Sequence, residues 1–175
     1  MKNSIAVMVS LGCLVLVAGI AVASKAEGPG MDLIRGKSAQ EAGMAALAQA
    51  EKLAGSGTWE SIAVARVYYL SGNKAQGQSI IDRVLAGKSD HNDWQRIGQI
   101  YADAGENDKA AQLFERALAA DPKDDTGQSE IGAWYISIGQ RDKGEELLTK
   151  AFARNPDEGS HYLRAAQAYL KVAPR

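Results

Sequence analysis

Residues 91–122 read HNDWQRIGQIYADAGENDKAAQLFERALAADP, and this stretch decides the fold. Its first half has residues at the i, i+3, i+4, i+7 spacing of one helix face, namely Trp94, Ile97, Gly98 and Tyr101. Its second half repeats the pattern with Ala110, Leu113, Phe114, Ala117 and Leu118. Gly105 between the halves ends the first helix, and either Asn107 or Asp108 caps the second. Pro122 cannot continue the second helix, so the stretch predicts a helical hairpin.

The two small residues Gly98 and Ala110 let the helix axes approach closely in this hairpin. We expect Trp94, Tyr101 and Phe114 to fill the space around that contact. A helix of about 14 residues spans only ~20 Å and is marginal alone in water. The hairpin therefore needs neighbours.

The stretch resembles a tetratricopeptide repeat (TPR) at each signature position of that 34-residue unit. The matching residues are Trp94, Ile97, Gly98, Tyr101, Ala110, Phe114, Ala117 and Pro122. The same pattern recurs 34 residues later in Ile131, Gly132, Tyr135, Gly144, Leu148, Ala151 and Pro156. A divergent copy stands 33 residues earlier, in Val64, Ala65, Tyr68, Gly77, Ile81 and Val84. Three stacked repeats are the usual minimum for a continuous core.

The resemblance implies an all-α fold, a TPR-type α-α superhelix of about three helical hairpins plus a C-terminal capping helix. We expect a TPR domain over 38–175, with repeats at about 58–90, 91–124 and 125–158 and a cap helix at 159–172. Tyr162 and Tyr169 take core positions of the pattern in that cap helix. Ser38 and Glu41 form a capping box that opens a helix to about Leu53. This helix is either the remnant second helix of a lost repeat or an N-terminal cap.

The N-terminus has the pattern of a secretory signal peptide. Residues 1–23 combine a positive start at Lys2, an uncharged apolar run and a small-residue site ending at Ala23. We expect cleavage after Ala23 and export to the periplasm or envelope. The alternative is an uncleaved anchor in the inner membrane, since residues 4–23 are long enough to span a bilayer. Residues 24–37, with Gly28, Pro29 and Gly30, are predicted to be a flexible linker.

Composition and motifs provide no chemistry for catalysis. The chain has 20 Lys and Arg against 21 Asp and Glu, which argues against nucleic-acid binding. Its two histidines, His91 and His161, fall in the first turns of predicted helices, and we interpret them as polar residues beside caps. No phosphate-binding loop or nucleophile elbow occurs in the sequence. We therefore expect no enzyme activity, no metal, no cofactor and no small-molecule substrate.

The resemblance also implies a binding groove lined by the first helix of each repeat. Carried over position by position, its contact residues are Trp59, Ile62, Arg66, Tyr69, Asn92, Gln95, Arg96, Gln99 and Ile136. Trp59 and Tyr69 are the expected anchors for a bound peptide, while Gln95 and Gln99 are expected to bond its backbone. The implied partner is another protein or a peptide segment of one.

The sequence thus favours an exported interaction module, an adaptor or assembly scaffold that binds a peptide segment in the concave groove. One alternative is a membrane-tethered accessory subunit of an envelope enzyme complex, similar to the TPR components of cytochrome c maturation, held through residues 4–23. The other is a structural subunit that self-associates through the helix at 38–53 or the cap at 160–171.

Overall fold

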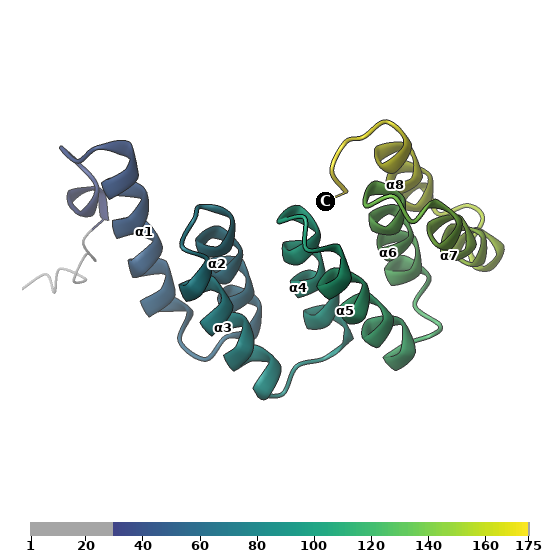
Figure 1. Ribbon diagram of the computed structural model, residues 1–175, viewed down its shortest axis with the longest axis horizontal. Coiled ribbons are helices and arrows are strands. Elements are labelled where there is room, and N and C mark those ends of the chain that lie inside the picture. The colour runs from purple at the N-terminus through teal and green to yellow at the C-terminus, as the bar shows by residue number, and fades with distance from the viewer. Residues whose placement is uncertain (1–29, 175) are drawn as a thin grey trace, which may run out of the picture.

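The computed structural model describes residues 30–174, and over that range the chain is all-α, as the sequence predicts. Eight α-helices follow one short 3₁₀ helix, η1 (Gly30–Leu33), in the described range. They are α1 (Ala39–Ala54), α2 (Thr58–Leu70), α3 (Lys74–Ala86), α4 (His91–Asp103), α5 (Asn107–Ala120), α6 (Asp125–Ser137), α7 (Arg141–Arg154) and α8 (Gly159–Tyr169). The helices are arranged in series along the long axis of the molecule (Figure 1).

Three antiparallel pairs form the body of the molecule: α2 with α3, α4 with α5, and α6 with α7. The first helices of successive pairs also touch, so that α4 contacts α2 and α6, and α8 packs mainly on α6. Helix α1 packs on α2 at the opposite end (Figure 1). Each element therefore rests on its near neighbours, which is the contact pattern of a solenoid.

Close approach within each pair depends on small residues. A Cβ atom added at Gly98 would lie 3.3 Å from the carbonyl oxygen of Ala110 and 2.6 Å from the Phe114 ring. Between α6 and α7, a Cβ at Gly132 would lie 2.9 Å from the carbonyl oxygen of Gly144. These distances leave no room for a side chain, so the prediction that Gly98 and Ala110 bring the two axes together is confirmed.

The turns inside the pairs follow one design. Gly105 has a φ of 76°, and the amide of the next residue, Glu106, donates to the carbonyl oxygen of Tyr101 at 2.8 Å. This hydrogen bond satisfies an orphan carbonyl at the end of α4, and only glycine tolerates that φ at little cost. The prediction that Asn107 or Asp108 caps α5 is wrong, because Glu106 is the N-cap residue and no side chain bonds there. The Glu106 carboxylate instead binds the side chains of Tyr69, Lys74 and Lys109.

The capping box at the start of α1 is confirmed. The Ser38 side chain accepts from the amide of Glu41, and the Glu41 carboxylate accepts from the amide of Ser38 at 3.0 Å. The described part of the expected linker contains η1, where the amide of Arg35 donates to the carbonyl oxygen of Met31 at 2.9 Å.

Three aromatic side chains expected in the core are less buried than the pattern predicts. Trp94 is only partly buried, since its Nε1–H donates to Ser89 Oγ at 2.9 Å and the Arg116 guanidinium lies 3.8 Å from its ring centroid. Tyr162 and Tyr169 of α8 are 55 % and 46 % exposed. The prediction of core positions for both tyrosines is wrong, because no second helix follows α8 in the described chain to cover them.

The predicted signal peptide or anchor at residues 1–23, and residues 24–29 of the linker, lie outside the described residues. Among the helices of residues 30–174, none has the length and apolar character needed to cross a bilayer.

Candidate functional site

The surface formed by α2, α4, α6 and α8, called the first-helix face below, contains most of the predicted contact residues. Polar side chains bridge the gaps between its helices. Arg66 of α2 pairs with Asp103 of α4, and Gln95 of α4 donates to Glu130 of α6. Arg164 of α8 reaches the other carboxylate oxygen of Glu130. The bridging partners are 34 to 37 residues apart, so each bridge joins neighbouring repeats.

These bridges change the role of two predicted contact residues. Gln95 is buried and already donates to Glu130, so its amide nitrogen is not free for a peptide backbone. Arg66 is half-exposed and already paired with Asp103. Both side chains act first as links between repeats, and a ligand would have to share their remaining hydrogen-bonding capacity.

A hollow of about 250 Å³ lies on this face between α4 and α6. Its lining residues are Asn92, Gln95, Arg96, Gln99, Asp124, Thr126, Gly127 and Glu130. Four predicted contact residues therefore meet at one place: Asn92, Gln95, Arg96 and Gln99. Asn92 and Arg96 are exposed, and Gln99 is half-buried. The lining offers amide donors and acceptors, one cation and two carboxylates within a small volume.

Gly127 keeps this hollow open on the α6 side. A Cβ atom at Gly127 would lie 2.3 Å from Asp124 Oδ2 and 3.3 Å from Gln95 Oε1. Because the closest atom belongs to the end of an acidic side chain, an alanine here would displace that carboxylate and not the backbone. The glycine thus maintains the shape of the hollow and is a functional candidate that sequence reasoning missed. Its unusual position in the first turn of α6 was the only available signal.

Trp59 extends the site towards α2. It is 58 % exposed, and the Arg96 guanidinium lies 5.8 Å from its ring centroid, within cation–π range. Since Arg96 also lines the hollow, the indole and the hollow form one continuous surface. An exposed tryptophan beside a polar pocket matches the usual composition of a binding hot spot.

The prediction that Tyr69 is an exposed anchor is wrong. Tyr69 is only 4 % exposed, its ring edge packs on Tyr101 at 5.6 Å, and its hydroxyl donates to Glu106 Oε1 at 2.7 Å. Burial, reinforced by the Glu106 carboxylate, raises the pKa of the Tyr69 phenol. Ile62 is likewise in the hydrophobic core and cannot line a groove. Both side chains turn inward because α2 packs against α4 and α3 at once.

Ile136 lies apart from the other predicted residues. It lines a separate hollow of about 560 Å³ at the far end of α6, together with Trp134, Ser137, Arg141, Ala168, Tyr169 and residues 171–174. The chain beyond α8 folds over this hollow, and Pro174 is buried there. Apart from the two core residues Ile62 and Tyr69, the predicted contact set therefore divides into a group on and beside α4 and the isolated Ile136.

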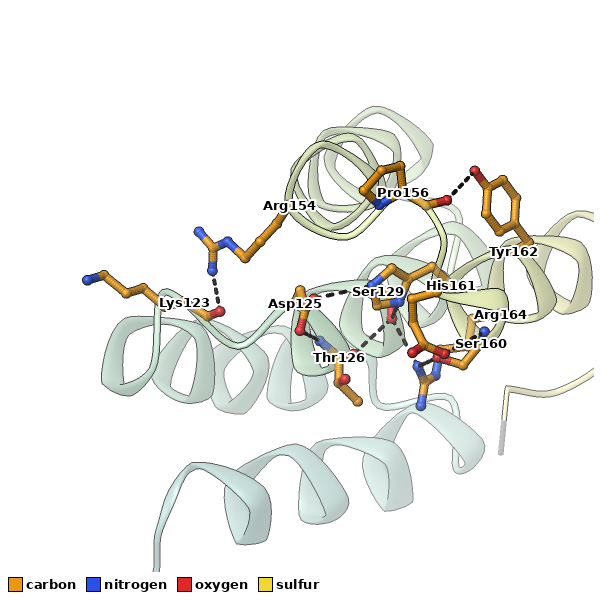
Figure 2. A network of polar contacts seen from close by, with 11 residues as sticks. Lys123, Asp125, Thr126, Ser129, Arg154, Pro156, Ser160, His161, Tyr162 and Arg164 are labelled. Carbon is orange, nitrogen blue, oxygen red and sulfur yellow. Dashed lines mark hydrogen bonds and ion pairs between the residues drawn. The ribbon is translucent and has the colours of Figure 1, made fainter.

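A polar network joins α8 to α6 beneath the surface (Figure 2). His161 is fully buried, with Nδ1 3.0 Å from Ser129 Oγ and Nε2 3.6 Å from Asp125 Oδ2. His161 lies in the first turn of α8 beside the N-cap residue Glu158, as interpreted, but it is buried because the start of α8 packs on α6. Arg164 Nη1 donates to Ser129 Oγ at 3.1 Å, which ties the same two helices.

This serine, histidine and carboxylate lie in the order of a nucleophilic triad, yet their surroundings suit a structural role. Ser129 and His161 are both fully buried, so a substrate has no route to the hydroxyl. The Ser129 hydroxyl also donates to the carbonyl oxygen of Thr126 at 2.9 Å, which occupies the proton that a base would remove. The network holds the terminal helix in place. Within residues 30–174, no cluster of three or more histidine, cysteine or acidic side chains is placed to hold a metal ion.

Residues 101–171 match the sequence profile of the tetratricopeptide repeat family. The matched segment covers α5 to α8, and with the all-helical pairs described above it supports a TPR protein. Repeats of this family generally mediate protein–protein interactions. Compared with curated proteins and with solved structures, the chain has no significant match.

Proposed function

We propose that the chain is an adaptor that binds a peptide segment of another protein on its first-helix face, at the hollow between α4 and α6 and the adjoining Trp59. The observation that supports this most is the continuity of an exposed indole with a pocket of free amides. Asn92 and Gln99 are positioned to pair with peptide bonds of an extended chain. Trp59 supplies the apolar surface on which one ligand side chain packs.

The ligand chemistry follows from the lining. Asp124 gives the hollow a carboxylate, both oxygens of Glu130 are already bound by Gln95 and Arg164, and Arg96 borders the hollow with one cation. An extended segment with a basic side chain for the hollow and an aliphatic or aromatic side chain for Trp59 satisfies both parts. A strongly acidic segment does not, because it would meet the Asp124 carboxylate in a confined space.

The test is selection of binders from a displayed library of random peptides, followed by affinity measurement on variants. Trp59→Ala should weaken the selected peptides by about 30-fold, corresponding to on the order of 2 kcal/mol for one hot-spot residue. Gly127→Ala should also weaken them by filling the hollow. Thr149→Ala, on the exposed side of α7, is the matched control and should change nothing. If the selected peptides bind Trp59→Ala and Gly127→Ala as tightly as the wild type, the binding site lies elsewhere.

We further propose that the protein acts outside the cytoplasm, in a periplasm or envelope. The support is the leader at residues 1–23, with its positive start, apolar run and small-residue site before Ser24. N-terminal sequencing of the protein from its own cells should begin at Ser24. A sequence beginning at Met1 would contradict cleavage and favour the membrane-tethered alternative.

A further inference from the structure

The described series of helices begins with α1 and ends with α8, and neither belongs to one of the three pairs. The exposed face of α1 corresponds to the exposed face of α8. Inside the row, each pair brings a small residue of its first helix against a small residue of its second. These matched residues are Ala65 with Gly77, Gly98 with Ala110, and Gly132 with Gly144. The same contact therefore occurs three times in the described chain, and it defines what a complete pair looks like.

Helix α1 has the register of a second helix, and no first helix pairs with it among residues 30–174. The residues 34 positions before Gly77 and Ile81 are Gly43 and Leu47. Leu47 is buried against the core, as Ile81 is. A Cβ atom at Gly43 would meet nothing within 4 Å, whereas one at Gly77 would lie 2.8 Å from the carbonyl oxygen of Ala65. This register supports the interpretation of α1 as a remnant second helix, one of the two that the sequence left open.

The open side of α1 is an apolar stripe. Gly43, Ala46, Ala50 and Leu53 follow one another at helical spacing and are all exposed, Leu53 to 75 %. The counterparts of Gly43, Ala46 and Ala50 in α3, α5 and α7 are buried or half-buried inside their pairs, whereas the counterparts of Leu53 are exposed. Nothing in the described chain takes that place beside α1.

Helix α8 shows the opposite arrangement, the register of a first helix with no second helix paired to it within the described residues. The residues 34 positions after Gly132 and Tyr135 are Ala166 and Tyr169. Gly132 and Tyr135 are buried under α7, whereas Ala166 and Tyr169 are exposed. Tyr162 completes this face and is exposed as well. The chain after Tyr169 turns away through Lys171, with a φ of 57°, and forms no helix in the described range.

We propose that copies of this chain associate head to tail, with α1 of one copy packing on α8 of the next as α5 packs on α4. Gly43 of one copy then meets Ala166 of the other, and the small residues Ala46 and Ala50 leave room for the two tyrosine rings. Among the helices of residues 30–174 that have the register of a second helix, α1 is the one whose pairing face is exposed. This match between the α1 stripe and the α8 face argues for a second copy of the chain as the occupant of the α8 face.

This interface is heterologous, since each copy contributes a different surface at each end. Because the contact continues the series of helices from one copy to the next, association extends to open chains of copies and does not stop at dimers. The contact is one helix against one helix, far below the area of a stable interface, so association is weak and depends on concentration. The first-helix face stays free, because the contact adds to the row at its ends.

The experiment uses two variants of the full chain with one blocked end each. Gly43→Arg blocks the α1 stripe, and Ala166→Arg blocks the α8 face; both sites are exposed, so folding is retained. In sedimentation velocity up to about 1 mM, a range suited to weak interfaces, the wild type should gain mass continuously with concentration. Each variant alone should remain at the monomer mass. Thr149→Arg, which adds the same charge on α7, should associate like the wild type.

An equimolar mixture of the two variants is the decisive measurement. One intact α8 face and one intact α1 stripe remain, so the mixture should form a dimer of twice the monomer mass and nothing larger. A wild type that stays monomeric, or a mixture that gives no dimer, overturns the proposal. Association of the single variants equal to that of the wild type also overturns it and indicates a contact through other residues, including residues 1–29. Peptide binding at Trp59 is independent of all these outcomes.

Discussion

The pair of α4 and α5 and the single helix α8 carry the same residue pattern, and they differ in what covers it. Tyr101 of α4 is buried, whereas the equivalent Tyr169 of α8 is nearly half-exposed. Gly98 lies tight against Phe114, whereas the equivalent Ala166 faces open space. The pattern therefore specifies which face of a helix is apolar. Whether that face is buried depends on the next helix.

The largest expected effect comes from truncating one aromatic residue in each of the two regions. Phe114→Ala should lower the free energy of unfolding by about 3–5 kcal/mol, because the ring is fully buried and packs edge-on against Tyr135 at 5.6 Å. Tyr169→Ala should cost less than about 1 kcal/mol at its exposed site. Urea denaturation followed by circular dichroism measures both. Equal losses would mean that α8 is covered in solution.

Two glycine substitutions should change the free energy of unfolding in opposite directions. Gly98→Ala should destabilise by about 1–3 kcal/mol, because its Cβ would lie 2.6 Å from the Phe114 ring and the pair would have to separate. Gly43→Ala should stabilise by about 0.5–1 kcal/mol, since alanine favours the helix and nothing lies nearby. Thermal melts at low protein concentration give the signs directly. A destabilising Gly43→Ala would place a first helix against α1 within one copy.

The smallest expected effect is the change in stability at low pH. Lys109, then Lys74 and Tyr69, hold the pKa of Glu106 at about 2, below its ordinary value of 4.5. A depressed folded-state pKa gives stability that is complete above the ordinary value and is lost as pH falls towards the folded value. The equivalent turn residue between α6 and α7 is Gln140, which has no charge to lose.

Acid should therefore loosen the α4–α5 turn before the α6–α7 turn. Melts between about pH 5 and about pH 2.5 should show a smaller loss of stability for Glu106→Gln than for the wild type. Gln140→Ala is the control and should keep the wild-type slope. Identical slopes for Glu106→Gln and the wild type would show that the ion pairs of Glu106 are already broken.

The helical pairs follow from local rules and could be predicted from the sequence. The capping box at Ser38, the turn glycine at Gly105 and the close contact at Gly98 each depend on residues within one helix or one hairpin. Helix spacing and turn chemistry suffice for such features. The confirmed part of the prediction has this local character.

The site was harder to predict from the sequence than the fold, because contacts between repeats fix the positions of its residues. Tyr69 is buried by Tyr101 and Glu106, and Gln95 is engaged by Glu130, partners that lie more than 30 residues away. His161 is buried because α8 meets α6 at that point. A repeat pattern gives the face on which a residue stands, but it does not give the partner that occupies it.

The ladder of polar bridges along the first-helix face has a mechanical consequence. Its links use charged or amide side chains at helix surfaces, with Glu130 shared between Gln95 and Arg164. These links join neighbouring repeats and are partly buried, so salt in the solvent screens them only weakly. The spacing of the repeats is thus fixed by polar contacts on one face of the solenoid as well as by the apolar contacts inside it.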